Sequence, residues 1–374
     1  MAALGGSATG ARPTFRDARD PHIVVRPFVW SRLRATRLES AASALVVATW
    51  RERVGSMLAR TALLVWLVWA CGVAAAPTWT AFPLPEGSGP HDVAPATDGA
   101  VWFTAQAAGK LGRLDPRTGR VDEFPLGQGS APHGVILGPD GAPWVTDGGL
   151  NAVLRFDPGA HAIRRFPLPA NRPNANLNTA TFDRAGRLWF TGQNGVYGQV
   201  EPQSGAVRVW DAPRGPGPYG IATTRSGAVY FASLAGGYVA RIDTESGAAR
   251  VIEPPTPRQG ARRVWPDGRG ALWVSEFHAG QIARFEPEEN AWRSWHLPGT
   301  DPQPYAIYVD ERDTVWVSDF GVGALLRFDP ASGRFDRVAG QAGEIWIRQL
   351  LGRPGEVWGA DSAHDRLIRV SEGG

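Results

Sequence analysis

The stretch PHGVILGPDGAPWVTDGGLNAVLRFDPGAHAIRRFP, residues 132–167, decides the fold, because the chain from Trp79 to Val370 repeats its pattern. Each block contains a short apolar segment with one aromatic residue, and this aromatic recurs every 41 to 45 residues. The seven anchor aromatics are Trp102, Trp144, Trp189, Tyr230, Trp273, Trp316 and Trp358. A period of this length indicates a repeat architecture in which each block is one supersecondary unit.

Each block consists of four short segments that are rich in β-branched and aromatic residues and are separated by Gly, Pro, Asp and Asn. In the quoted block the segments begin near Pro132, Trp144, Ala152 and Ile163. Four such segments per period are typical of propeller blades, whereas a helical solenoid needs long stretches with apolar residues at i, i+3 and i+4. We therefore predict an all-β fold, a seven-bladed β-propeller of four-stranded blades.

The two ends of the repeat region predict how the ring closes. The seventh block stops at Gly374, too early to contain a fourth strand. Residues 79–87, WTAFPLPEG, precede the first block and match the fourth-strand phrase RFPLP at residues 165–169. We predict that this N-terminal strand completes the last blade, so that no sheet edge stays open between the first and last blades.

Residues 1–76 lack the repeat and form a different kind of segment. They carry ten Arg and four acidic residues, and they end in the apolar run TALLVWLVWACGVAAA at residues 61–76. A basic residue before such a run and small residues at its end are typical of a secretory signal peptide, which we place at residues 57–76. We interpret residues 1–56 as a mis-assigned or disordered basic extension; the alternative is a real basic tail followed by an uncleaved anchor. The propeller domain is predicted at residues 77–374.

The charge and cysteine content of the remaining chain exclude some classes of partner. Without residues 1–76 the chain keeps 29 basic and 32 acidic residues, a net charge of −3, which gives no support for nucleic-acid binding. The single cysteine, Cys71, lies in the signal segment, so no disulfide is predicted and a lipid anchor at Cys71 is the alternative to cleavage. We expect an extracytoplasmic monomer, periplasmic or secreted, that meets the membrane only through this segment.

Functional sites in propellers usually lie at one mouth of the central channel, where the loops of all blades converge. The residue eleven positions before each anchor aromatic lies at the start of the innermost strand, and the residue three positions after it ends the next strand near the same mouth. The first series is His91, His133, Asn178, Tyr219, Arg262, Tyr305 and Ile347, with Arg348 beside the last; the second is Ala105, Asp147, Gly192, Ser233, Glu276, Asp319 and Asp361. These groups either bind a ligand or a metal, or they only solvate the mouth.

The blade formula is similar to that of the virginiamycin B lyase (streptogramin lyase) family. It runs from Pro-His-Gly-Val or Pro-Tyr-Ala-Ile through Asp-Gly and Trp-Val-Ser-Glu/Asp to Ile-Ala-Arg-Phe, and the resemblance covers residues 79–370. A looser likeness extends to NHL-repeat and gluconolactonase-type propellers. The resemblance implies a lyase that linearises a cyclic depsipeptide by elimination at its ester bond. A histidine base removes the proton next to a carbonyl, and Mg²⁺ held by carboxylates stabilises the developing charge.

The chain departs from the family pattern at the start of the last two blades, where the resemblance implies the catalytic histidines. Tyr305 and Ile347 stand there, and Gln303 and Ile345 occupy the positions where an acid is expected. Asp361 keeps a carboxylate at the expected later point. By direct correspondence, the catalytic base is therefore missing.

A rotated arrangement is our hypothesis for the missing base. His91 and His133 lie one blade apart, Asp147 follows His133 by fourteen residues, and ring closure places Asp361 of the last blade beside the first blade. In this hypothesis the histidines are catalytic and the two carboxylates hold the metal.

A second sector of the mouth is predicted to hold a polar or anionic ligand through its arginine. The predicted ligand-binding residues are Asn178, Tyr219, Arg262, Glu276, Tyr305 and Asp319. The alternative for Arg262 and Glu276 is an ion pair that fastens adjacent strands together.

Two classes of function stay open. One is a metal-assisted lyase, or a gluconolactonase-like hydrolase, that acts on an extracytoplasmic small molecule; the other is a non-catalytic propeller that binds a ligand or a protein. Both place a small molecule or a peptide at the channel mouth. The lyase predicts metal binding that depends on Asp147 or Asp361, and the binding protein predicts a ligand that is lost on changing Tyr219 and Tyr305. No Ser-His-Asp elbow, phosphate-binding glycine loop or cysteine metal motif is present.

Overall fold

The computed structural model describes residues 77–338 and 344–371. The predicted extension at residues 1–56 and the predicted signal peptide at residues 57–76, with Cys71, lie outside these residues. Within them every regular element is a β-strand. The same ranges contain no helix of the length and apolarity that a membrane crossing requires.

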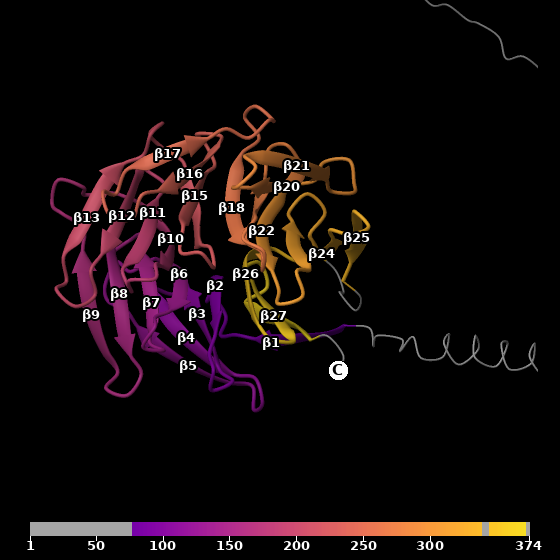
Figure 1. The fold of residues 1–374 in the computed structure, drawn as a ribbon. Coiled ribbons are helices and arrows are strands. Elements are labelled where there is room, and N and C mark those ends of the chain that lie inside the picture. Colours follow the sequence, from indigo (N-terminus) through magenta and orange to yellow (C-terminus); the bar gives the residue numbers. More distant parts are fainter. Residues whose placement is uncertain (1–76, 339–343, 372–374) are drawn as a thin grey trace, which may run out of the picture. The chain divides into compact units, whose positions relative to one another are not determined.

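The strands form seven antiparallel sheets of four strands each, which confirms the predicted seven-bladed propeller (Figure 1). The innermost strands are β2 (Pro90–Pro95), β6 (Pro132–Leu137), β10 (Leu177–Phe182), β14 (Pro218–Thr223), β18 (Ala261–Pro266), β22 (Pro304–Val309) and β26 (Ile347–Arg353). The second strands are β3 (Val101–Ala105), β7 (Pro143–Asp147), β11 (Leu188–Gly192), β15 (Val229–Ser233), β19 (Leu272–Glu276), β23 (Val315–Asp319) and β27 (Glu356–Asp361).

The outer half of each blade has the same regularity. The third strands are β4 (Lys110–Asp115), β8 (Ala152–Asp157), β12 (Val196–Val200), β16 (Tyr238–Ile242), β20 (Gln281–Glu286), β24 (Ala324–Asp329) and β28 (Arg366–Ser371). The outermost strands are β5 (Arg120–Pro125), β9 (Ala162–Pro167), β13 (Val207–Asp211), β17 (Ala249–Ile252), β21 (Ala291–His296), β25 (Arg334–Arg337) and β1 (Thr78–Pro83). We number the blades one to seven from β2–β5 to the blade of β26, β27, β28 and β1. The innermost strands contact one another in this order, and β26 contacts β2, which closes the ring.

The predicted closing strand is confirmed in the last blade. β1 pairs antiparallel with β28 from Thr78 opposite Ser371 to Pro83 opposite Arg366. Phe82 of β1 is buried and stacks on Trp358 with ring centroids 5.3 Å apart. The ring is therefore held shut by backbone pairing and by a buried aromatic contact between its two ends.

Short turns with a left-handed residue connect the first and second strands of the blades. In blade two Gly141 has φ 75°, a conformation that a residue without Cβ adopts at little cost. Blade six has Asp313 at this point with φ 61°, and its carboxylate accepts a hydrogen bond from the backbone N–H of Gly268 in blade five. Asp is among the residues that tolerate the left-handed region, so blade six forms the turn with Asp313 in place of a glycine.

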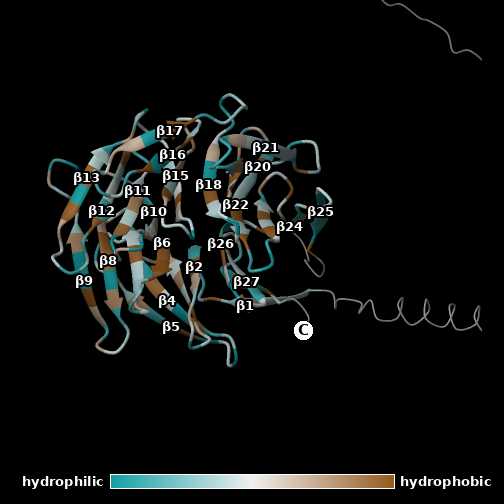
Figure 2. Ribbon diagram, viewed as in Figure 1, coloured by the Kyte–Doolittle hydropathy of each residue, from teal (hydrophilic) through white to brown (hydrophobic). Residues whose placement is uncertain are grey.

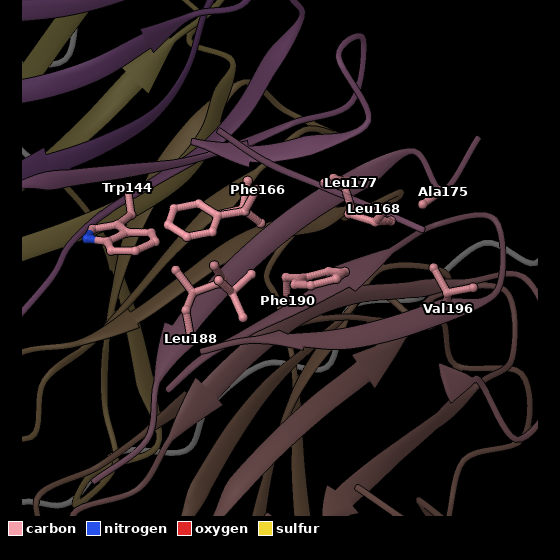
Figure 3. Packing of buried hydrophobic residues seen from close by; sticks show 11 residues of the cluster. Trp144, Phe166, Leu168, Ala175, Leu177, Leu188, Phe190 and Val196 are labelled. Atoms are coloured by element: carbon pink, nitrogen blue, oxygen red, sulfur yellow. The ribbon is translucent and has the colours of Figure 1, made fainter. Parts of the chain in front are cut away.

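The core consists of layers between adjacent blades, and hydrophobic residues concentrate in the strands (Figure 2). Figure 3 shows one layer, in which Trp144 and Phe166 of blade two pack with Leu188 and Phe190 of blade three. All seven anchor aromatics are at most 3% exposed, so each belongs to the core between blades. In three blades the indole N–H of the anchor donates to the aspartate six residues earlier, as Trp316 does to Asp310 at 2.8 Å.

Each innermost strand carries a register irregularity near its start. In blade one Pro90 faces Ala105 and Val93 faces Phe103, so His91 and the next residue together oppose one residue of β3. Such bulges bend the strand and redirect side chains. The bulge is also tied to its neighbour, because the hydroxyl of Thr104 donates to the carbonyl of His133 in the next blade at 2.9 Å. Equivalent bonds from Thr146, Thr191, Ser275 and Ser318 repeat this link.

Candidate functional site

The bulges bring side chains from all seven blades into one buried polar network. The residues that it joins are His91, Asp92, His133, Asn178, Thr179, Tyr219, Arg262, Arg263, Tyr305 and Arg348. Six of them belong to the predicted series: the two histidines, Asn178, the two tyrosines and Arg262. Because seven strands converge here, residues far apart in the sequence come within hydrogen-bond distance.

The two predicted histidines meet. Their ring centroids are 3.7 Å apart, and the residues are 2% and 5% exposed. His91 Nδ1 lies 2.8 Å from Asp92 Oδ1, which fixes the tautomer with the proton on Nδ1 and leaves Nε2 as an acceptor. Asn178 accepts from Thr179 through its amide oxygen, so its Nδ2 donates to His133 Nε2 at 3.0 Å and the proton of His133 is on Nδ1. His133 Nδ1 is buried without a partner among the described residues.

Both imidazoles are held neutral. Burial lowers the pKa of His91 well below its usual value, and the charges of Arg263, Arg348 and Arg262 lower it further. Burial likewise lowers the pKa of His133, as does its histidine neighbour, whereas Asp92 acts in the opposite direction. An imidazole in a low-dielectric site among cations loses its protonated form first. At neutral pH both histidines are therefore uncharged and able to accept a proton.

Arg263, which sequence reasoning missed, crosses the channel and binds three other blades. Its Nη2 lies 3.1 Å from Asp92 Oδ1 of blade one and 3.3 Å from the carbonyl oxygen of Arg348 of blade seven, and its Nη1 donates to Thr179 Oγ1 of blade three at 2.7 Å. Burial lowers the pKa of Arg263, but Asp92 and Tyr219 raise it to a net value above the ordinary one. Burial raises the pKa of Asp92, although Arg263 lowers it.

Tyr219, Arg262 and Tyr305 of the predicted ligand-binding residues meet, with Arg348 in addition, whereas Glu276 and Asp319 are bonded elsewhere. Tyr219 Oη and Tyr305 Oη are 2.8 Å apart, and Arg262 donates to Tyr219 Oη at 2.7 Å while its guanidinium lies 3.5 Å from the centroid of the Tyr305 ring. Burial raises the pKa of Tyr219 to about 12. Burial raises the pKa of Tyr305 too, but the positive charge of Arg262 and of its arginine neighbours outweighs this and the net pKa is lowered. The added residue is Arg348, which donates to Tyr305 Oη at 3.3 Å.

The predicted carboxylates do not join the histidines. Asp147 accepts from Ser130 and from the backbone N–H groups of Ala131 and Leu150, so its carboxylate organises its own loops. Asp361 in the same way accepts from the Trp346 N–H, from His364 and from Arg366, and Asp319 accepts from two backbone N–H groups. Their position in the blade therefore serves loop structure.

Glu276 has no ion pair with Arg262 among the described residues, so the predicted alternative of a strand-fastening bridge does not form. Its carboxylate instead accepts from the Gln281 side chain, and its Oε1 is buried without a partner in the described part of the chain. Burial raises the pKa of Glu276 to about 7. A carboxyl group so poorly solvated adds little negative charge to the mouth.

One group of side chains in the described ranges has the spacing of a metal site. It consists of His91, Asp92 and His133, whose ligand atoms lie within 4.8 Å of one another; Asp147 and Asp361 are not members. This group does not fit Mg²⁺, which prefers oxygen ligands, because two of its three donors are imidazoles. In addition, Asp92 Oδ1 already forms an ion pair with Arg263, and the positive charge of Arg263 disfavours a metal cation beside it.

A cavity of about 300 Å³ adjoins the network on the side toward the far ends of the innermost strands. Asp92, Arg263 and Gln349 line it together with apolar residues such as Leu137 and Trp265. Sequence reasoning missed this cavity and the polar residues that it shares with the network. The bulge could have indicated Asp92 and Arg263, because its second residue, directly after His91 or Arg262, also faces the channel region. In blade seven the network contains Arg348, the residue beside the predicted Ile347, because this blade is one residue shorter between its first two strands and Ile347 is buried in the core.

The buried histidine pair predicts an acid-sensitive fold. In the unfolded chain both histidines titrate near pH 6.5, whereas in the folded state their pKa values are lowered, so below pH 6.5 the unfolded state binds more protons. The free energy of unfolding should fall with pH from 6.5 to 5.5, by up to about 1.4 kcal/mol for each histidine. Urea denaturation at each pH measures the slope. The double variant His91→Asn, His133→Asn should lose most of it and His161→Asn, at an exposed site, should keep it; equal slopes in all three proteins contradict the prediction.

Comparisons with known proteins agree with this architecture. A model of the virginiamycin B lyase family matches residues 71–328. A selenomethionine-substituted virginiamycin B lyase from Staphylococcus aureus is 21% identical, with a TM-score of 0.73 over 79% of this chain and 99% of that chain. A streptogramin B lyase structure is 23% identical, with a TM-score of 0.72 over 79% and 98%.

A catalytically inactive histidine-to-alanine variant of the Staphylococcus aureus virginiamycin B lyase, crystallised with quinupristin, has 21% identity and a TM-score of 0.72 over 79% of this chain and 99% of that chain. No curated protein sequence matches the chain. At these identities the solved structures bear on the fold alone.

Proposed function

The chain belongs to the virginiamycin B lyase family, and from this premise we propose that it is an extracytoplasmic lyase that opens a cyclic ester by β-elimination. The observation that carries the proposal is the hydrogen bond between His91 and Asp92, close to the positive charges of three arginines. The carboxylate orients the imidazole, and burial keeps the imidazole unprotonated, which are the two properties that a general base requires.

In the proposed reaction His91 Nε2 takes the proton from the carbon next to a carbonyl group. The electron pair of that C–H bond forms a carbon–carbon double bond, the neighbouring carbon–oxygen bond of the ester breaks, and its electrons leave on the carboxylate. The charges of Arg262, Arg263 and Arg348 favour the negative charge that develops on the carbonyl oxygen. Because His91 is 2% exposed, side chains around it must rearrange as the substrate enters.

The proposed elimination does not use a divalent metal. The family resemblance implies Mg²⁺, but Asp147, Asp319 and Asp361 bind loop N–H groups and side chains, and Asp92 is paired with Arg263. The residues present therefore do not form a magnesium site, and the cationic charge comes from arginine.

We expect turnover of a cyclic depsipeptide ester that is insensitive to chelation. Treatment with EDTA should change the rate less than about twofold, and His91→Gln should lower kcat by roughly 10²-fold or more, the usual contribution of a general base. Liquid chromatography with mass spectrometry measures the rate and identifies the chemistry, because elimination leaves the mass unchanged whereas hydrolysis adds one water.

The matched control is His161→Gln, an exposed histidine of the loop before β9, which should turn over as the unchanged protein does. Loss of activity in EDTA, a hydrolysed product, or full activity of a folded His91→Gln protein would each overturn the proposal.

The burial of both histidines favours a second candidate, a non-catalytic propeller that binds its ligand at the arginine and tyrosine sector. This candidate predicts saturable binding without turnover. It also predicts that His91→Gln leaves binding unchanged while changes at Tyr219 and Tyr305 remove it.

A further inference from the structure

The channel mouth carries more positive charge than the protein itself neutralises. Three arginines, Arg262, Arg263 and Arg348, meet at the two tyrosines, but Asp92 is the one carboxylate in the network and it pairs with Arg263. Neither Arg262 nor Arg348 forms an ion pair with any described residue. Half-buried arginines elsewhere in the propeller form ion pairs, as Arg284 does with Asp267 and Arg366 does with Asp361.

The two unpaired guanidinium groups are held in place by hydrogen bonds to neutral partners. Arg262 donates to Tyr219 Oη at 2.7 Å, and Arg348 donates to Tyr305 Oη at 3.3 Å and to Ser362 Oγ at 2.9 Å. The phenol oxygens are themselves 2.8 Å apart, so one short chain of bonds joins the two cations. The Nε donor of Arg262 is buried and has no partner within the described ranges. Such fixed donors cost little entropy when an anion binds.

The nearby acids do not supply the missing negative charge. Burial raises the pKa of Glu276 to about 7, and its carboxylate is bonded to Gln281. Asp319 Oδ1 accepts from the backbone N–H groups of Gln303 and Gly321. Burial raises the pKa of Tyr305, but the charge of Arg262, the hydrogen bond with Tyr219 and the charges of Arg263 and Arg348 together lower it. Half-buried cations without counter-ions are unfavourable unless a ligand supplies the charge.

Aromatic side chains surround Arg262 and Arg348. Phe320 stacks on Tyr305 with ring centroids 4.1 Å apart, and Trp346 meets Phe320 edge-on at 5.1 Å. Phe277 lies on the other side, 5.1 Å from the Arg262 guanidinium and 6.2 Å from the Tyr305 ring. Phe277, Phe320 and Trp346 are all half-buried, so they retain surface for a ligand. Aromatic faces of this kind stack on flat apolar groups.

We propose that Arg262 and Arg348 together bind the carboxylate of a ligand whose adjoining aromatic group packs against Phe320 and Trp346. A guanidinium presents paired N–H donors that match the two oxygens of a carboxylate. A carboxylate suits this half-buried aromatic mouth better than a strongly hydrated phosphate dianion does. The proposed carboxylate site does not depend on whether the protein is a catalyst. If it is a lyase, the same site receives the carboxylate that leaves in the elimination.

Isothermal titration of the whole protein with phenylacetate and with its uncharged amide, phenylacetamide, tests the proposal without requiring turnover. We expect phenylacetate to bind at least tenfold more tightly than phenylacetamide, and its affinity to fall as salt is added. Arg348→Gln and Arg262→Gln should each weaken phenylacetate binding at least tenfold, whereas Arg262→Lys, which keeps the charge, should weaken it less.

The control variant is Arg155→Gln, which removes an arginine of β8 paired with Asp140 at the surface and should bind as the unchanged protein does. Thermal melts establish whether each variant is folded. If Arg262→Gln does not fold, Arg348→Gln, a change at a half-buried residue, tests the proposal by itself. Equal affinity for the acid and the amide, unchanged binding by folded Arg348→Gln, or tighter binding of phenyl phosphate would overturn the proposal. Absence of turnover by the unchanged protein, together with phenylacetate binding that depends on Arg348, would overturn the lyase alone.

Discussion

A chain that begins at residue 84, and therefore lacks β1, is expected to lose the closed ring. The deletion removes six paired positions along β28 and the buried contact of Phe82 with Trp358. Truncating a buried phenylalanine alone costs about 3–5 kcal/mol, so the melting temperature should fall by roughly 10 °C or more. It also exposes β28 as an open edge, which favours pairing with another chain.

Differential scanning fluorimetry and light scattering measure the two effects. The matched control begins at residue 77 and keeps β1; it should melt as the full chain does and stay dispersed. Phe82→Ala in that control should account for a large part of the loss by itself. If the shortened chain melts at the same temperature and shows no tendency to associate, the closure by β1 does not stabilise the ring.

Arg263→Met is expected to destabilise the propeller as strongly as any single substitution in the channel. Arg263 is 5% exposed and joins blades one, three and seven through Asp92, Thr179 and the Arg348 carbonyl. Its loss leaves Asp92, which is 1% exposed, as a buried carboxylate without its cation. Breaking a buried pair in this way costs about 3–5 kcal/mol, whereas removing both charges together costs much less. The double variant Arg263→Met, Asp92→Asn should therefore recover most of the loss.

Denaturation with urea at several pH values separates this effect from a simple packing defect. Burial already raises the pKa of Asp92, and without Arg263 the pKa rises further, so the stability of the single variant should approach that of the double variant as the pH falls and Asp92 becomes neutral. Arg155→Met, at an exposed pair, should cost at most about 1 kcal/mol. A single variant as stable as the double at neutral pH would show that the ion pair carries no coupling energy.

The candidate site was predictable only in part, and particular residues show why. His91, His133, Tyr219 and Tyr305 were found by their phase in the repeat, because the bulge at the start of each innermost strand is set by local pairing with the next strand. Two of the four carboxylates at the ends of the second strands, Asp147 and Asp361, were predicted to hold a metal. The structure places both in hydrogen bonds within their own loops.

Three residues of the network lie one position after those that the repeat indicates. Asp92 and Arg263 were not predicted, because alternation along a regular strand turns the next side chain away, and the bulge cancels that rule. Arg348 stands beside the indicated position of blade seven, and it faces the network because this blade lacks one residue between its first two strands. In both cases a small departure from the repeat decided which side chain faces the network.

The seven blades, their four strands and the strand that closes the ring could be predicted from the residues alone. These features follow from periodicity and turn residues, which act over a few positions and recur in every block. Which side chains meet across the channel depends on the closed fold. Asp92 and Arg263 are 171 residues apart in the chain, and their pairing depends on the closed ring and on the direction that each bulge gives its side chain. No local pattern encodes such a contact, because it arises from the closure of all seven blades at once.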